Sequence, residues 1–221
     1  MYRALVNALF QGIIRYYTTL TIEGESNVPK GGCIICANHL SHSDSLFLML
    51  ATRQTSDTMA FVAAYDYWFK HKIRRALFTS ALTLIPIDRR PKEKREIPFK
   101  VTITRCREFL DEKKDGKIVF YGTGSRDKGA FQVKPGIVLL SASLGIPIVP
   151  IQLKNTDVFF GKNKRWFQKT PVKATIMRPI VPNITFDSKQ NQFCPDQVSA
   201  IVKKIENSLA SSTVVCGKKR S

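Results

Sequence analysis

The amino-acid sequence predicts an α/β fold in which a mostly parallel sheet is flanked by helices. Short apolar runs rich in Ile, Val and Phe alternate with segments whose apolar residues recur at helical spacing, and this alternation is typical of parallel sheets. The 221 residues are 43% hydrophobic, which is enough for one domain with a substantial core and excludes a wholly disordered chain.

Residues 1–17 have the pattern of an amphipathic helix. Apolar side chains recur in two adjoining stripes, one of Leu5, Leu9, Ile13 and Tyr16 and one of Val6, Phe10 and Tyr17. With Arg3 and Arg15 beside the stripes, the helix suits a membrane interface, and it would equally suit ordinary packing on the domain. The chain lacks a run of about 18 uncharged apolar residues and a small-residue cleavage site, so we expect neither a spanning helix nor a signal peptide.

The domain proper is expected at residues 18–210, with a basic tail at 211–221. Strands are predicted where apolar runs alternate or are uninterrupted, at 18–23, 33–37, 59–64, 82–87, 117–121, 146–153 and 172–177. Helices are predicted where apolar residues recur every three or four positions, at 44–51, 65–78, 99–114, 136–144 and 195–209. Ser43 stands at the N-cap position of the 44–51 helix, and Asp44 lies in its first turn.

Charge and cysteine usage narrow the class of protein. A formal net charge of +18 predicts an anionic partner, which could be nucleic acid, acidic lipid, a phosphorylated substrate or an acidic carrier protein. The five cysteines have no framework spacing, and the pair Cys33 and Cys36 lies inside an apolar strand with no second pair to complete a metal site. We expect buried free thiols and a reducing compartment.

The segment 38–44, with the sequence NHLSHSD, follows the buried strand 33–37 and enters the next helix. Ligands bind at strand ends in such sheets. The spacing allows Asp44 to accept a hydrogen bond from one nitrogen of His39, while the other nitrogen takes a proton from a substrate hydroxyl. His42 is out of register, and we interpret it as a turn or substrate-side residue rather than a second base.

Two other predicted strand ends carry arginine. Arg89 follows the strand at 82–87, and Arg126 closes the glycine-rich turn 122–126, with the sequence GTGSR. The planar guanidinium suits phosphate, and the glycines allow the backbone to approach it. Because GTGSR lacks the spacing of a P-loop or of a dinucleotide fingerprint, both of those sites are excluded.

In order, these segments resemble the four motifs of the glycerolipid acyltransferases, the 1-acyl-sn-glycerol-3-phosphate acyltransferase family. NHLSHSD resembles the NHx4D signature, after a lead-in at 23–32. The later motifs are matched by LIPIDR at 84–89, by GTGSR at 122–126 with VKPG at 133–136, and by GIPIVP at 145–150. The resemblance covers roughly residues 18–155 and implies the α/β fold of that family with a helix at the membrane interface.

The resemblance also implies a reaction. His39 would be the general base on a lysophosphatidic acid hydroxyl, which attacks an acyl thioester of coenzyme A or acyl carrier protein, and Asp44 would orient it. No metal or further cofactor is implied. The substrate-binding residues implied by the motifs are Arg89, Thr123, Gly124, Ser125, Arg126 and Lys134.

One position departs from the family pattern. Aligning Arg126 with the arginine of the third motif places Thr123 where the family has a glutamate and Ser125 where it has threonine. Since a carboxylate would favour a cationic head group, its absence favours an anionic acceptor.

Several aromatic and basic residues leave two interpretations open. Phe61, Tyr65, Trp68 and Phe69 would line an acyl groove or belong to the core. The segment 155–169, with aromatics among lysines, would be an interfacial loop or a packed surface loop. Lys92, Lys94 and Arg95 are expected to favour anionic lipid head groups.

The expected partners are therefore a membrane surface with anionic lipids, a lysophospholipid acceptor and, for one donor, acyl carrier protein. We expect a peripheral or monotopic protein on the cytoplasmic face. A nucleic-acid-binding protein would explain the charge but not the four ordered motifs, so no nucleic acid partner is expected. A non-catalytic lipid-binding homologue, and an acyltransferase for glycerol 3-phosphate or another lyso-lipid, remain as alternatives.

Overall fold

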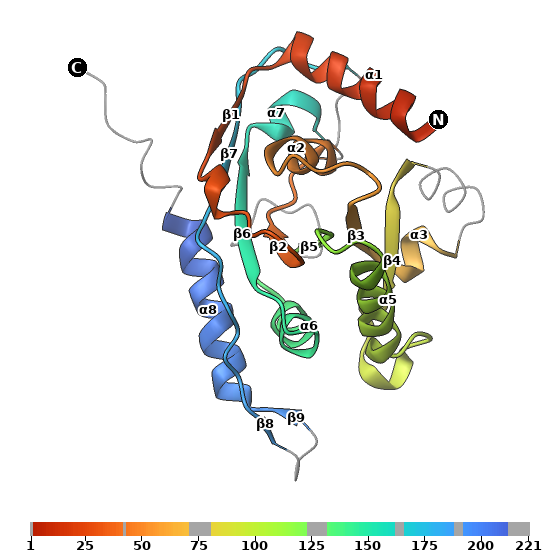
Figure 1. The fold of residues 1–221 in the computed structure, drawn as a ribbon, viewed down its shortest axis with the longest axis vertical. Coiled ribbons are helices and arrows are strands. Elements are labelled where there is room, and N and C mark those ends of the chain that lie inside the picture. The colour runs from red at the N-terminus through yellow and green to blue at the C-terminus, as the bar shows by residue number, and fades with distance from the viewer. Residues whose placement is uncertain are drawn as a thin grey trace.

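The computed structural model describes residues 2–41, 43–70, 81–122, 132–161, 166–187 and 192–211, and a seven-stranded sheet lies at its centre (Figure 1). The strands lie in the order β1, β7, β6, β2, β5, β3, β4. Their bounds are β1 Leu20–Glu23, β2 Cys33–Ala37, β3 Met59–Ala64, β4 Thr83–Ile87, β5 Lys117–Tyr121, β6 Ile148–Lys154 and β7 Val172–Ile176. Neighbours among them run parallel except β6 and β7, which confirms the predicted mostly parallel sheet.

Strand β2 lies in the middle of the sheet between β5 and β6, and every residue of it is buried. Successive side chains of a strand point to opposite faces, so Ile35 joins the core on one face and Ile34 the core on the other. A strand covered on both faces has to be apolar throughout, which explains the uninterrupted run at 33–37.

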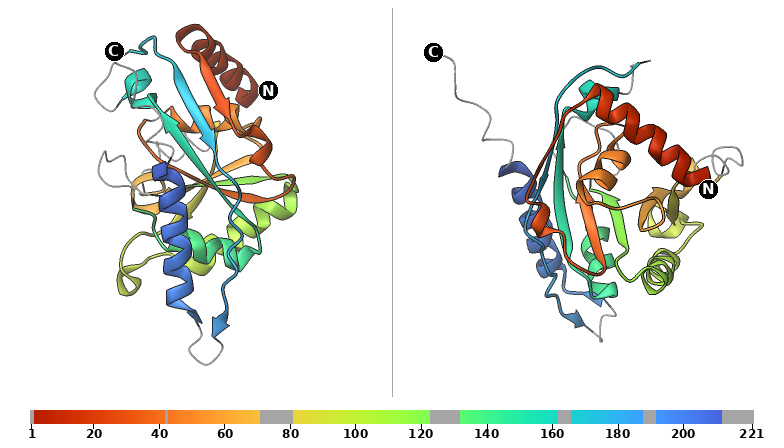
Figure 2. Two further views of the ribbon diagram at one scale, coloured as in Figure 1. Left: turned by 90° about the vertical axis from the view of Figure 1, so that its left-hand side faces the viewer. Right: turned by 45° about the horizontal axis from the view of Figure 1, so that its top comes forward.

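Helices cover both faces of the sheet, as predicted. On one face pack α1 (Tyr2–Tyr17), α2 (Asp44–Ala51) and α7 (Thr156–Phe160), through buried residues that include Ile14, Phe47 and Phe159. On the other face pack α5 (Phe99–Glu112), α6 (Gly136–Leu144) and α8 (Pro195–Ser211), through residues that include Cys106, Ile137 and Ile205. Figure 2 shows α1 and α8 on opposite sides of the sheet.

The N-terminal segment is helical, as its periodicity predicts, but its side chains divide between two environments. Ile14 is buried against the sheet, whereas Leu9 and Tyr16 are 64% and 69% exposed. The helix therefore packs on the domain and still presents apolar residues outward. Among the described residues, no helix is long and apolar enough to span the hydrocarbon core of a bilayer.

Short elements are where the predicted and observed structures differ. The prediction omitted α7, the hairpin strands β8 (Phe186–Asp187) and β9 (Gln192–Phe193), and the single-turn helices η1 (Glu25–Asn27) and η2 (Lys92–Lys94). Of the predicted helix at 65–78, the structure shows α3 (Tyr65–Trp68), which ends before a turn at 69–70, and residues 71–80 lie outside the described part of the chain. Elements of two to five residues have too few positions to show a period.

The cysteines of β2 are core residues, as expected. Cys33 and Cys36 are fully buried free thiols on opposite faces of the sheet, because residues three apart in a strand point in opposite directions. Burial raises the pKa of Cys33 to about 11. A disulfide between them is excluded by this arrangement.

Candidate active site

The carboxyl end of β2 is tied to the neighbouring strand by the first residue of the NHLSHSD segment. Asn38 donates from Nδ2 to the carbonyl oxygen of Leu153, at 2.8 Å, and its Oδ1 accepts from the Leu153 N–H, at 2.7 Å. The backbone of β2 leaves the sheet at this point. The Asn38 side chain there makes the hydrogen bonds to β6 that the backbone no longer makes. The position of the next residue, His39, is therefore set by the sheet.

His39 and Asp44 are brought together as the spacing predicts. Nδ1 of His39 lies 2.9 Å from Oδ2 of Asp44. The carboxylate is fully buried, whereas the imidazole is 21% exposed. Because an ionised carboxylate is acceptor-only, Nδ1 carries the hydrogen and Nε2 is left as the acceptor toward solvent.

The same oxygen of Asp44 also organises the turn before α2. Oδ2 accepts from the backbone N–H of Leu40, at 2.7 Å, and of Ser41, at 2.8 Å. Within the described part of the chain, Oδ1 is buried and has no hydrogen-bond partner. Asp44 lies in the first turn of α2, where the helix dipole favours a negative charge.

Ser43 stands at the predicted N-cap position, but the prediction that it caps α2 is wrong. Its side chain makes no cap hydrogen bond, and its hydroxyl instead pairs with Ser41 Oγ at 2.8 Å. The Ser41 hydroxyl is also bonded to the carbonyl oxygen of Phe160, at the end of α7. These contacts attach the His39 turn to α7. The backbone N–H groups of Leu40 and Ser41 donate instead to the Asp44 carboxylate.

Tyr121 is a residue of the site that sequence reasoning missed. It is the last residue of β5, opposite Ala37 of β2, and its ring stacks on the imidazole of His39 with centroids 4.0 Å apart and planes 20° from parallel. Its hydroxyl lies 2.9 Å from Ser45 Oγ. Burial raises the pKa of Tyr121, and the nearby Asp44 carboxylate raises it further.

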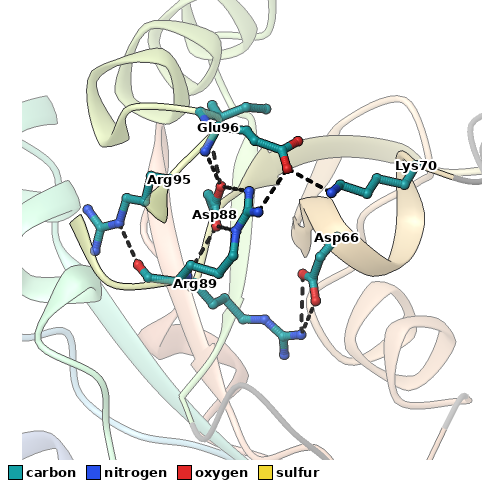
Figure 3. Close-up of polar contacts among 8 residues, drawn as sticks. Asp66, Lys70, Asp88, Arg89, Arg95 and Glu96 are labelled. Atoms are coloured by element: carbon teal, nitrogen blue, oxygen red, sulfur yellow. Dashed lines mark hydrogen bonds and ion pairs between the residues drawn. The ribbon is translucent and has the colours of Figure 1, made fainter. Parts of the chain in front are cut away.

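The turn after β4 is organised by one buried carboxylate. Asp88 accepts from Nε and Nη2 of Arg90 and from the backbone N–H of Arg90 and Glu96 (Figure 3). Chiefly because of the Arg90 side chain, the pKa of Asp88 lies well below its usual range. Arg90 also pairs with Glu96, which lies 2.7 Å from Lys70.

Arg89 pairs with a different carboxylate from the one that holds Arg90. Its Nη2 lies 3.4 Å from a carboxylate oxygen of Asp66 on α3, and both side chains are about half exposed (Figure 3). Such an exposed pair is weak, so the guanidinium remains accessible to a stronger anion. The structure thus assigns Arg90 to the turn itself and leaves Arg89 at the sheet edge where it was predicted.

The third predicted binding segment is described only at its two ends. Gly122 donates its N–H to the Ala37 carbonyl oxygen and accepts from the N–H of Lys134, so residues 122 and 134 both lie beside the end of β2. The Lys134 side chain is exposed. Thr123, Gly124, Ser125 and Arg126 lie outside the described residues, as does His42.

The two open interpretations of the aromatic segments are partly decided. Phe61 is a core residue at 3% exposure, and Tyr65 and Trp68 are half-buried on α3. In 155–169, Phe159 is fully buried and Phe167 packs against Tyr17, whereas Trp166 is 80% exposed. Of the four aromatic residues of that segment, all of them described, Phe159, Phe160 and Phe167 belong to or pack against the core and Trp166 is exposed. Lys94 and Arg95 are exposed, and the Lys92 side chain lies outside the described residues.

Within the described residues no group of three or more His, Cys, Asp and Glu side chains is placed to hold a metal ion. The site there contains one base with its carboxylate, one stacked phenol and one exposed arginine. It has the groups for abstracting a proton from a hydroxyl that lies near an anionic group.

Comparison with known proteins identifies the family and the fold of the chain. The chain matches the acyltransferase family over residues 19–154, which is more than half of its length. Its fold resembles the crystal structure of the 1-acyl-sn-glycerophosphate (LPA) acyltransferase PlsC from Thermotoga maritima, with a TM-score of 0.65 and 18% identity over 98% of this chain and 81% of that one. The search of curated proteins found no matching sequence. Because the family match extends over residues 19–154, more than half of the chain, the chain belongs to the acyltransferase family.

Proposed function

We propose that the protein transfers a fatty acyl group from acyl-CoA or acyl-ACP to the free hydroxyl of lysophosphatidic acid, as a step of phospholipid synthesis. The observation that carries the proposal is the 2.9 Å contact between His39 Nδ1 and the buried Asp44 carboxylate, which leaves Nε2 for the substrate. The fold of the Thermotoga maritima LPA acyltransferase supports the choice of acceptor.

In this mechanism the substrate hydroxyl is the nucleophile. Nε2 of His39 takes its proton as the oxygen forms a bond to the thioester carbonyl carbon, and the imidazolium is stabilised by Asp44. The tetrahedral intermediate then collapses, the carbon–sulfur bond breaks, and the thiolate receives the proton from His39. The donor is consumed as a substrate, and the mechanism needs no further cofactor.

The acceptor's phosphate is assigned to Arg89 and Arg126. Arg89 lies at the end of β4, on the same edge of the sheet as His39, and its present partner Asp66 is half exposed. A phosphate dianion competes well for such a guanidinium, because two parallel hydrogen bonds to oxygen are available. Thr123, Gly124, Ser125 and Lys134 are proposed to complete the anion site from the turn after β5.

We also propose that the domain binds the cytoplasmic face of a membrane that contains anionic lipids. Tyr16 on α1 is exposed, and Lys169 Nζ lies 4.9 Å from the Tyr16 ring centroid. Trp166, which precedes Lys169 in the same segment, is 80% exposed. Tyr, Trp and Lys side chains are those that favour the head-group region of a bilayer. The exposed Leu9 extends this surface along α1.

The catalytic proposal is tested by thiol release from acyl-CoA and acyl-ACP, with and without lysophosphatidic acid, for wild type and His39→Ala. We expect acceptor-dependent release that falls by at least about a hundredfold in the variant. Asp111→Asn, on the exposed face of α5, is the control for a remote substitution. Near wild-type turnover in His39→Ala would remove His39 from the mechanism.

One sequence feature favours a second candidate. Thr123 stands where the family has a glutamate, which favours an acyltransferase for another acceptor or a lipid-binding homologue without catalysis. The same assay with glycerol 3-phosphate and other lyso-lipids separates these cases. Turnover with one of them alone identifies a different acceptor, and lipid binding without turnover on any of them identifies a non-catalytic homologue.

The membrane proposal is tested by co-sedimentation with vesicles of phosphatidylglycerol and phosphatidylcholine. Trp166→Ser and Tyr16→Ser are expected to weaken binding to the anionic vesicles. Val181→Ser replaces another exposed apolar residue, 73% exposed, and serves as the matched control. Equal binding by all three variants would exclude this surface.

A further inference from the structure

The His39 ring is held by contacts in two perpendicular directions. Asp44 Oδ2 contacts it in the plane of the imidazole, at 2.9 Å from Nδ1, and Tyr121 lies against its face, with ring centroids 4.0 Å apart and planes 20° from parallel. A hydrogen bond to one nitrogen leaves the ring free to tilt about that bond. A flat side chain against the face removes this freedom.

Both contacts are anchored to the first turn of the same helix. Asp44 begins α2, and the next residue, Ser45, exchanges a 2.9 Å hydrogen bond with the Tyr121 hydroxyl. Tyr121 is also fixed at its backbone, because β5 pairs with β2 and Tyr121 lies opposite Ala37. The phenol is therefore attached at its backbone to the sheet and at its hydroxyl to α2, with His39 beside it.

The electronic character of Tyr121 also suits this place. Burial, together with the Asp44 carboxylate, raises the pKa of its hydroxyl, so the ring remains a neutral phenol at any physiological pH. The face of a neutral aromatic ring carries a partial negative charge that attracts a cation. Among the described residues, the titratable groups in contact with His39 are Asp44 of α2 and Tyr121 of β5.

We propose that Tyr121, tethered by Ser45, is a positioning residue that holds the plane of the His39 ring and stabilises its imidazolium when the substrate proton is taken up. This inference rests on the proposed role of His39 as the general base. It predicts an effect on kcat rather than on the KM of the acceptor, because Tyr121 acts through His39.

The test compares three variants. Tyr121→Leu removes the ring, Tyr121→Phe keeps the ring and removes the tether, and Ser45→Ala removes the tether from its other end. The chain has three histidines, so the His39 imidazole signal is assigned by its loss in His39→Ala. Its pKa is then measured by NMR in each variant, beside the kcat and KM of acyl transfer and the melting temperature.

In Tyr121→Leu, which removes the aromatic face beside the imidazolium, we expect the measured pKa of His39 to fall and kcat to fall by roughly tenfold, with the acceptor KM unchanged. Tyr121→Phe should restore the pKa and most of the kcat. Ser45→Ala should resemble Tyr121→Phe, since both leave the ring without its tether. Equal pKa values in the Leu and Phe variants would overturn the proposal.

The two proposals fail in distinguishable ways. If wild type shows no acyl transfer, the proposed function fails, and the NMR titration still decides whether Tyr121 sets the protonation of His39. If transfer depends on His39 but the Leu variant keeps both its pKa and its kcat, the function stands and the positioning role is refuted. A lowered melting temperature with an unchanged His39 pKa would assign Tyr121 to structure alone.

Discussion

The guanidinium of Arg90 is bound by the buried carboxylate of Asp88, two residues before it, through contacts of 2.9 and 2.5 Å. Arg89, between them, extends to the half-exposed Asp66. Two adjacent arginines of the same turn thus have different tasks. One stabilises the loop, and the other forms a half-exposed pair with Asp66 at the edge of the sheet.

This division predicts different effects of replacing the two arginines. Arg89→Ala should raise the KM for a phosphorylated acceptor by roughly tenfold or more, because a charge-assisted contact is lost, and should leave the melting temperature unchanged. Arg90→Ala should chiefly lower the melting temperature, since it leaves the buried Asp88 without its main partner. Arg105→Ala, on exposed α5, is the control. Equal KM values for the Arg89 and Arg105 variants would contradict the assignment.

Asp44→Asn tests the orientation of the base. The amide keeps the size of the side chain but removes the charge that stabilises the imidazolium, so kcat should fall by at least about a hundredfold with little change in acceptor KM. Single-turnover kinetics with saturating thioester measure this directly. The Asp111→Asn variant should retain wild-type kinetics. If Asp44→Asn raised the acceptor KM and left kcat unchanged, the carboxylate would instead be a substrate-binding group.

The pH dependence of the free energy of unfolding should reveal the contribution of the ionised Asp88 side chain. Its pKa is lower in the folded protein than the ordinary value, chiefly because of Arg90, so its ionised form contributes stability above about pH 4, and this is lost as the pH falls from there toward the folded-state pKa. Urea unfolding of wild type and Asp88→Asn should therefore differ most near neutral pH and converge in acid. A difference that stays constant with pH would exclude this linkage.

The cysteines predict a labelling pattern. Burial raises the pKa of Cys33 to about 11 and of Cys106 to about 12, and Cys36 is fully buried, so these three thiols should resist iodoacetamide in the native protein. Of the four cysteines in the described residues, Cys194, which is half-buried, should be alkylated first. Mass spectrometry before and after unfolding measures each site. Rapid native labelling of Cys36 would mean that the centre of the sheet opens readily.

Much of the fold could be predicted because local patterns determine it. The uninterrupted run 33–37 indicates a strand buried on both faces, and the four-residue gap between His39 and Asp44 suffices to predict their contact. The neighbours of β2 could not be predicted, since strand order depends on how distant segments pack. The same holds for the antiparallel pairing of β6 with β7.

Within the site, sequence reasoning failed where a residue's role depends on a partner far along the chain. Tyr121 closes an apolar strand and has the pattern of a core residue, and its contact with His39 exists because the sheet brings the two residues side by side. The choice between Arg89 and Arg90 depends on the geometry of Asp88. Residue type alone does not distinguish two adjacent arginines.

The position of β2 between β5 and β6 also has a consequence for how the chain folds. Residues 33–37 find their partners only after residues 117–121 and 148–154 have been synthesised, and such long loops make closure slow. The ribosome therefore releases the His39 turn long before its neighbours exist. Until β6 emerges, an apolar strand destined for the centre of the sheet has open edges, so early shielding by a chaperone or by the membrane would favour correct folding.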